Sequence, residues 1–218
     1  MDIDVTEPAQ PDSALRRRLL GIGLGGAAVS LLPFLIGRAS ATTPNSGPPD
    51  TAGSTTTTSP PKRPTDADVA LLGFAQTIEL AARNLYDVAL ATKNFDVNER
   101  AVMATIRESH EAYATALSAE LGRQAPQEVN QSFDDLKASF SGDKSTVLKA
   151  AYDLESTAVA THIDILAKLQ GTDGASLLAS ILIVEARHGT VLAYLNGATD
   201  LETLLVDKEA DALAPAGG

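Results

Sequence analysis

The stretch Ile181-Leu182-Ile183-Val184-Glu185-Ala186-Arg187-His188 places a carboxylate and an imidazole three residues apart inside an apolar run. Steps of four and three residues extend this stripe through Ile181, Glu185, His188, Leu192 and Leu195. Such spacing predicts the inward face of an amphipathic helix. Because an unpaired carboxylate is costly to bury, we expect Glu185 to be hydrogen-bonded, ion-paired or bound to a metal.

The composition of the chain limits what it can do. Its 218 residues suit one globular domain with appendages. There is no Cys, which excludes thiolate metal sites, thiol nucleophiles and disulfides. A net charge of −11 argues against a nucleic-acid-binding surface, which would be basic. With no Trp and 4% aromatic residues, the core must be built from small aliphatic side chains, and this favours helices.

The first 41 residues predict an export signal. Arg16-Arg17-Arg18 precede an apolar run over residues 19–36, and Ala39-Ser40-Ala41 offers a cleavage site. Paired arginines before such a run are typical of a twin-arginine signal. The alternative is an uncleaved membrane anchor, because the run is close to the ~18 residues that a spanning helix needs. Under either interpretation the remaining chain lies outside the cytoplasmic membrane and could contact it only through this segment.

Residues 42–65 are rich in Thr, Pro, Ser and Gly and predict a disordered linker. Beyond it, the apolar spacing predicts long helices over residues 66–92, 97–121, 145–170 and 175–196. Asp96 and Glu99 form a capping-box pattern, and Gly122 and the break at 171–174 mark helix ends. We expect a short helix near 132–140, and another near 201–207 in the C-terminal tail, 198–218.

Four long amphipathic helices with no strand pattern predict an all-α protein, a four-helix bundle over residues 66–197. The first two helices are joined by a short loop, as are the last two, so each pair is expected to be antiparallel. The connection between the second and third helices is long enough to cross the bundle, ~35 Å at 1.5 Å per helical residue. The sequence therefore predicts a single long crossover.

Three glutamates lie at similar depth in this bundle. Glu79, Glu155 and Glu185 each fall near the middle of a predicted helix, on or beside its apolar stripe. Carboxylates that converge at one level cannot all stay ionised unless cations hold them. Oxygen ligands joined by imidazoles suit iron or manganese. These residues therefore predict a buried iron or manganese centre with one or two ions.

The sequence resembles the ferritin-like superfamily, and most closely the bacterial exported ferritin-like domains, over residues 66–197. Dimetal members carry one Glu on each of two helices and Glu-x-x-His on each of the other two. Glu79 and Glu155 match the two lone glutamates, and Glu185-Ala186-Arg187-His188 matches one Glu-x-x-His motif. The resemblance implies iron oxidation, iron binding or peroxide removal, and the residues do not distinguish among these activities.

The second helix departs from that pattern, because it carries Glu108-Ser109-His110-Glu111 where Glu-x-x-His is expected. Either Glu111 replaces the usual His, or His110 reaches the site from a shifted position. His162 lies seven residues, ~10.5 Å, beyond Glu155, too far to share one metal with that glutamate directly. It could orient a ligand, act as an extra ligand or be a hydrogen-bonded core histidine.

Two classes of function follow from this sequence. The first is an exported metal-binding protein whose site comprises Glu79, His110, Glu111, Glu155, Glu185 and His188, with metal ions as its partners and activity towards Fe(II), O2 or peroxide. The second is a metal-free bundle that serves as a structural or interaction module of the cell envelope. Whether the domain forms a homodimer along a helix face is left open.

Overall fold

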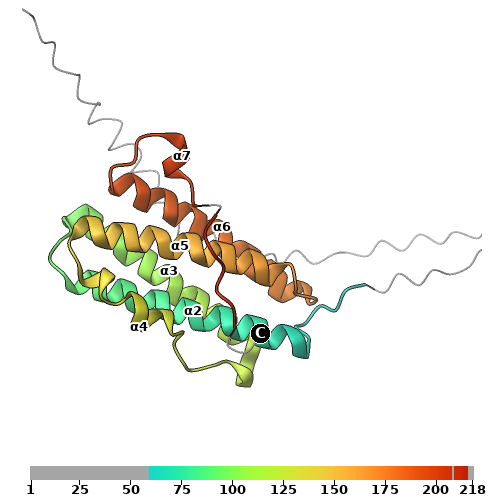
Figure 1. Cartoon of the computed structure of the whole chain (residues 1–218). Helices are drawn as coiled ribbons and strands as arrows, with labels where there is room; N and C mark the ends of the chain where they lie inside the picture. Colours follow the sequence, from blue (N-terminus) through green and yellow to red (C-terminus); the bar gives the residue numbers. More distant parts are fainter. Residues whose placement is uncertain (1–58, 208, 216–218) are drawn as a thin grey trace, which may run out of the picture. The chain divides into compact units, whose positions relative to one another are not determined.

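The structure is a computed structural model that describes residues 59–207 and 209–215, which all belong to one compact unit (Figure 1). The predicted signal or anchor over residues 1–41 and most of the predicted 42–65 linker lie outside the described residues. They stay predictions, which fractionation of the producing cells can check.

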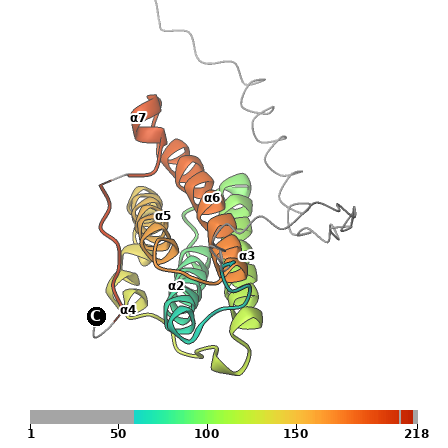
Figure 2. The ribbon, with the colours of Figure 1, turned by 90° about the vertical axis from the view of Figure 1, so that its right-hand side faces the viewer.

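Four long helices make up the described domain, and they confirm the predicted all-α bundle. They are α2 (Asp66–Ala91), α3 (Val97–Leu121), α5 (Lys144–Leu166) and α6 (Thr172–Leu195). Short helical turns lie between or after them: η1 (Gly122–Gln124), α4 (Ser132–Leu136), η2 (Ser139–Ser141) and α7 (Leu201–Leu204). Viewed towards the helix ends, α2 lies beside α3 and α5 lies beside α6 (Figure 2).

Side chains cap the starts of the first two long helices where the sequence predicts them. Thr65 caps α2 and Asp96 caps α3, and each is part of a complete capping box with the residue three positions on. Gly122 ends α3 with a φ of 59°, a conformation that costs a glycine little. The predicted starts of the first two helices are therefore confirmed.

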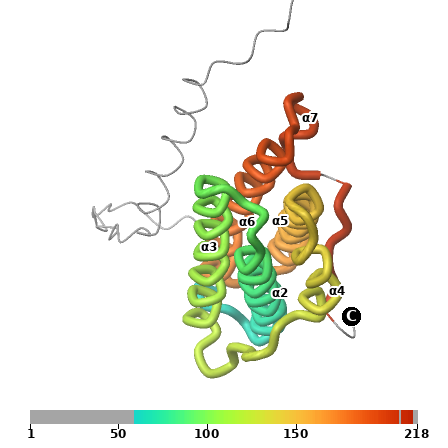
Figure 3. The backbone as a smooth tube through the Cα atoms, turned by 90° about the vertical axis from the view of Figure 1, so that its left-hand side faces the viewer, coloured from blue at the N-terminus to red at the C-terminus, as the bar shows by residue number. Residues whose placement is uncertain are grey.

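The connection from α3 to α5 runs along α2, so the predicted crossover is present (Figure 3). The Asn130 amide donates a hydrogen bond to the Thr77 carbonyl at 3.1 Å, and the Gln76 side chain donates to the Pro126 carbonyl at 3.4 Å. These bonds fix the connection to the outer side of α2. As a result α5 starts at the correct end of the bundle to run beside α2.

The break between the last two long helices is not where the sequence predicts it. The expected turn at 171–174 is wrong, because α5 ends at Leu166 and α6 begins at Thr172. The carbonyls of Pro61 and Lys62 accept the amides of Thr172 and Asp173, both at 3.0 Å. This segment, distant in sequence, satisfies amides that a helix start otherwise leaves unpaired, so α6 can begin earlier.

The side chain of Asp68 connects α2 to the α5–α6 loop at the same end of the bundle. Its buried carboxylate accepts hydrogen bonds from the backbone amides of Thr65, Gln170 and Gly171, at 2.8, 2.9 and 2.8 Å. Burial alone would raise the pKa of Asp68, but these amides hold it below its usual value. One carboxylate therefore caps α2 and joins it to the α5–α6 loop.

Replacing Asp68 with alanine is expected to lower the free energy of unfolding by about 3 kcal/mol, because three amides lose a charged acceptor. Chemical denaturation monitored by circular dichroism measures this change. Asp66→Ala is the matched control, since Asp66 lies in the same helical turn but is exposed. An equal effect of both substitutions would contradict the assigned role of Asp68.

The core has two apolar layers with polar residues between them. One layer gathers around Leu85, Met103 and Leu148, and the other around Leu72, Leu117 and Leu178. Within the described residues, α6 is also long and apolar enough to pass as a membrane span. Since Ile181 and Leu192 of α6 are fully buried in this core, we describe it as a bundle helix.

Candidate metal centre

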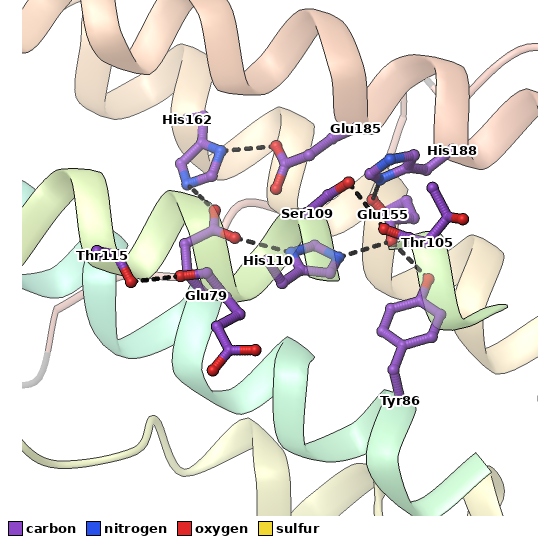
Figure 4. A network of polar contacts seen from close by, with 11 residues as sticks. Glu79, Tyr86, Thr105, Ser109, His110, Thr115, Glu155, His162, Glu185 and His188 are labelled. Carbon is purple, nitrogen blue, oxygen red and sulfur yellow. Dashed lines mark hydrogen bonds and ion pairs between the residues drawn. The ribbon is translucent and has the colours of Figure 1, made fainter. Parts of the chain in front are cut away.

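Between the two apolar layers lies a cluster of carboxylates and imidazoles drawn from all four long helices (Figure 4). Its members are buried, with at most 8% exposure, and the chain's three histidines are all among them. The cluster comprises Glu79 from α2, His110 from α3, Glu155 and His162 from α5, and Glu185 and His188 from α6. We call these six residues the central cluster.

Carboxylates and imidazoles alternate through the cluster. His162 Nδ1 lies 2.7 Å from Glu185 Oε2, and His162 Nε2 lies 3.5 Å from Glu79 Oε1. His110 then links two glutamates, with Nδ1 2.7 Å from Glu79 Oε2 and Nε2 3.1 Å from Glu155 Oε1. His188 Nδ1 ends the series, 3.3 Å from Glu155 Oε2. Each buried imidazole therefore has at least one carboxylate to compensate its charge.

Tyr86 of α2 joins this cluster at Glu155. Its hydroxyl donates a 2.5 Å hydrogen bond to Glu155 Oε1, and its ring stacks on His110 with centroids 5.4 Å apart. Burial and the charge of Glu155 raise the pKa of Tyr86 well above its ordinary value, so the phenol keeps its proton. Tyr86 therefore fixes the position of both a carboxylate and an imidazole.

Charge compensation differs between the two ends of the cluster. Burial would raise the pKa of Glu155, but the positive charges of His110 and His188 hold it well below its usual range. Burial also opposes protonation of His110, yet the charges and hydrogen bonds of Glu155 and Glu79 raise the pKa of His110 well above its ordinary value. These opposite pKa shifts favour an ionised Glu155 beside a protonated His110 in the metal-free protein.

At the other end of the cluster, the pKa values of Glu185 and His162 are both raised. Burial raises the pKa of Glu185 to about 7, although the charge of His162 opposes this rise. The pKa of His162 is also raised, because Glu185 and Glu79 outweigh the effect of burial. Protons bound to Glu185 and His162 therefore reduce the repulsion between the buried carboxylates of Glu79 and Glu185.

Two sets of ligand atoms in the cluster are close enough to hold an ion. His110, Glu155 and His188 form one set, and Glu79, His110 and Glu185 form the other, with one ligand atom from each residue lying within 4.8 Å of the others. Both sets use His110. A neutral imidazole has only one nitrogen free to bind a metal, since the other carries a proton. His110 can therefore complete only one of the two sets.

Three buried atoms can form a second set of ligands that does not need His110. Glu79 Oε1, His162 Nε2 and Glu185 Oε1 have no hydrogen-bond partner within the part of the chain that the structure describes. Two of them, Glu79 Oε1 and His162 Nε2, lie 3.5 Å apart. Buried polar atoms are rarely left without a hydrogen bond, and a bound ion would satisfy all three. Two carboxylate oxygens and an imidazole nitrogen are donors that suit iron or manganese. The donor set therefore fits the metal that the sequence predicts.

The structure brings together most of the residues that the sequence predicts for the site. Glu79, His110, Glu155, Glu185 and His188 all belong to the central cluster. Glu111 does not, and including it was wrong: its side chain is exposed on α3 and pairs with Arg107. His110 faces the core because it continues the stripe of Ile106 and Tyr113, while its neighbour in sequence faces away.

The sequence leaves the role of His162 open, and the structure places its side chain inside the cluster (Figure 4). Its seven-residue distance from Glu155 did exclude a shared ion, but the side chain instead points across the bundle towards Glu79 and Glu185. The sequence pattern did predict that His162 faces the core, because it lies on the buried stripe of α5 with Leu154 and Ile165. Only a three-dimensional arrangement shows which helix that stripe faces.

Fold and cluster together define a class of protein: a four-helix bundle whose core holds carboxylates and histidines capable of binding metal. The chain belongs to the ferritin-like domain family, whose model matches residues 67–198. Neither a curated protein nor a solved structure gives a significant match to the chain.

Proposed function

We propose that this ferritin-like domain binds two iron or manganese ions in its core and uses them to oxidise Fe(II) or to react with O2 or peroxide. One ion is held by His110, Glu155 and His188, and the other by Glu79, His162 and Glu185. The observation that carries the proposal is the group of three buried atoms that make no hydrogen bond to the described residues, Glu79 Oε1, His162 Nε2 and Glu185 Oε1.

Neighbouring groups hold the proposed ligands in place. Nδ1 of His110 faces Glu79 and Nδ1 of His162 faces Glu185, so each imidazole can present Nε2 to an ion. Such carboxylate–histidine pairs fix the tautomer and orientation of metal-binding imidazoles. Tyr86 restrains Glu155 in the same way, and the apolar layers exclude water. Bound iron or manganese would supply Lewis acidity and a one-electron redox couple.

Metal content per chain tests the proposal. The protein, prepared without a polyhistidine tag, is loaded anaerobically with Fe(II) or Mn(II), desalted and measured by elemental analysis. We expect two ions per chain, one for each of the two proposed ligand sets. His162→Ala and His188→Ala are each expected to retain one ion, because they disable different sets. Glu111→Gln, an exposed carboxylate on α3, is the control and should retain both.

The alternative function is a metal-free structural or interaction module, and one observation favours it. Three carboxylates face three imidazoles, so protonated histidines can neutralise the cluster without a metal. A protein that binds neither metal, and whose melting temperature is unchanged by a chelator, would support this module and contradict the metal site.

A further inference from the structure

A segment at the end of the chain lies across α5. Residues 205–207 and 209–215, here called the C-terminal strap, follow α7 and cross over α5 (Figure 1). The hydroxyl of Tyr152 donates to the Leu205 carbonyl at 2.5 Å. The amide of Asp207 donates to Ser156 Oγ at 3.1 Å, and that of Leu213 donates to Thr161 Oγ1 at 2.9 Å.

The two hydroxyls that accept these amides are buried, with Ser156 2% exposed and Thr161 fully covered. The strap residues themselves are exposed or half-buried. A segment that is exposed or half-buried and held by hydrogen bonds to side chains opens at a lower free energy than the helices beneath it. The strap can therefore leave α5 while the bundle stays folded.

The strap lies beside the most exposed part of the central cluster. His188 has the largest exposed fraction of the six residues, 8%. The next residue, Gly189, packs against Val206 of the strap so closely that an added Cβ would lie 2.6 Å from Val206 Cγ1. The same Cβ would lie 3.8 Å from Glu155 Cβ. Val206 therefore covers the backbone between two members of the cluster.

We propose that the C-terminal strap controls the access of ions and small solutes to the central cluster through His188. This regulatory role rests on the proposed metal-binding function. Closed, the strap keeps Val206 against Gly189 and limits exchange with solvent. Open, it exposes the His188 and Glu155 side of the cluster without moving any of the six cluster residues.

Two variants open the strap by different means. Tyr152→Phe/Ser156→Ala/Thr161→Val removes the three side-chain anchors, and Thr115→Val is its control because that hydroxyl is exposed on α3. Gly189→Ala displaces Val206 without touching the anchors. Its control is Gly73→Ala, since a Cβ at that helical glycine would make only ordinary contact, 3.6 Å from Pro126.

Two rates, measured on the full chain, report how readily ions and small solutes reach the central cluster. The first is the loss of loaded Mn(II) to excess chelator. The second is the reaction of the metal-free protein with diethyl pyrocarbonate, mapped to each histidine by mass spectrometry. The chain's three histidines all lie in the cluster, so no other imidazole contributes to the second rate. Both rates are expected to rise about ten-fold in the two strap variants, the change that follows when a local segment loses hydrogen bonds or packing.

The possible outcomes distinguish the proposed role of the strap from the proposed metal site. Faster reaction at His188 in both strap variants, with unchanged rates in both controls, supports the role of the strap in controlling access. Rates equal to those of the unsubstituted protein in both strap variants overturn that role, whatever the metal content. Failure of all proteins to bind metal overturns the proposed function only, because the histidine reaction still reports whether the strap opens.

Discussion

Replacing Glu155 with alanine is expected to lower the free energy of unfolding by about 4 kcal/mol, because removal of one partner leaves other buried charges uncompensated. Glu155 is fully buried and accepts hydrogen bonds from Tyr86, and it lies within 3.1 and 3.3 Å of nitrogens of His110 and His188. No neighbouring carboxylate described in the structure makes as many of these contacts. We also expect the variant to lose the ion held with His110 and His188.

Denaturant unfolding of the metal-free protein measures the first effect, and metal analysis measures the second. Asp153→Ala is the control, because Asp153 lies on the same helix but is exposed and pairs with Lys149. Exposed pairs of this kind contribute roughly 0–1 kcal/mol. If Glu155→Ala were as stable as this control, the central cluster would not contribute to the stability of the bundle.

The second large effect is a loss of stability as pH rises. For the metal-free protein, we expect the melting temperature to fall by several degrees between about pH 5 and pH 8, since each kcal/mol corresponds to about 2–4 °C in a domain of this size. The cause is the cluster itself, which retains protons that the unfolded chain releases. Thermal unfolding by calorimetry, in the presence of a chelator, measures this dependence.

The direction of this change in stability with pH follows from the pKa values of the cluster residues. The pKa of Glu185 rises from 4.5 to about 7 in the folded protein, so its contribution is complete below pH 4.5 and is lost as pH rises to about 7. The raised pKa values of His110 and His162 add contributions that are complete below pH 6.5 and are lost as pH rises further. The pKa of Glu155 is lowered, so it stabilises above pH 4.5 and adds no slope in this range.

A matched pair of variants isolates this effect. Glu185→Gln is expected to flatten the curve between pH 4.5 and about 7, because the amide does not titrate. Glu108→Gln, at an exposed position on α3, should leave the curve unchanged. Parallel curves for the unsubstituted protein and Glu185→Gln would show that Glu185 does not retain its proton on folding. Bound metal should reverse the trend, because ions displace protons from imidazoles and bind more strongly as pH rises.

Local patterns were sufficient to predict most of the fold. The bounds of α3 follow from the Asp96 cap and from Gly122, which are signals within a few residues of each end. The start of α6 could not be predicted in this way. Its first amides are satisfied by Pro61 and Lys62, more than 100 residues earlier in the chain. A helix end set by a distant carbonyl leaves no local pattern.

The same distinction applies to the site. By itself, the sequence determined that glutamates and histidines lie on apolar stripes at matching depth, because helical periodicity decides which side chains face inward. Only the tertiary structure decided that His110 rather than Glu111 enters the core, and that His162 reaches Glu79 and Glu185 instead of Glu155. The physical reason is that contacts across a bundle depend on how each helix is rotated and offset against its neighbours, and packing of the whole core sets both.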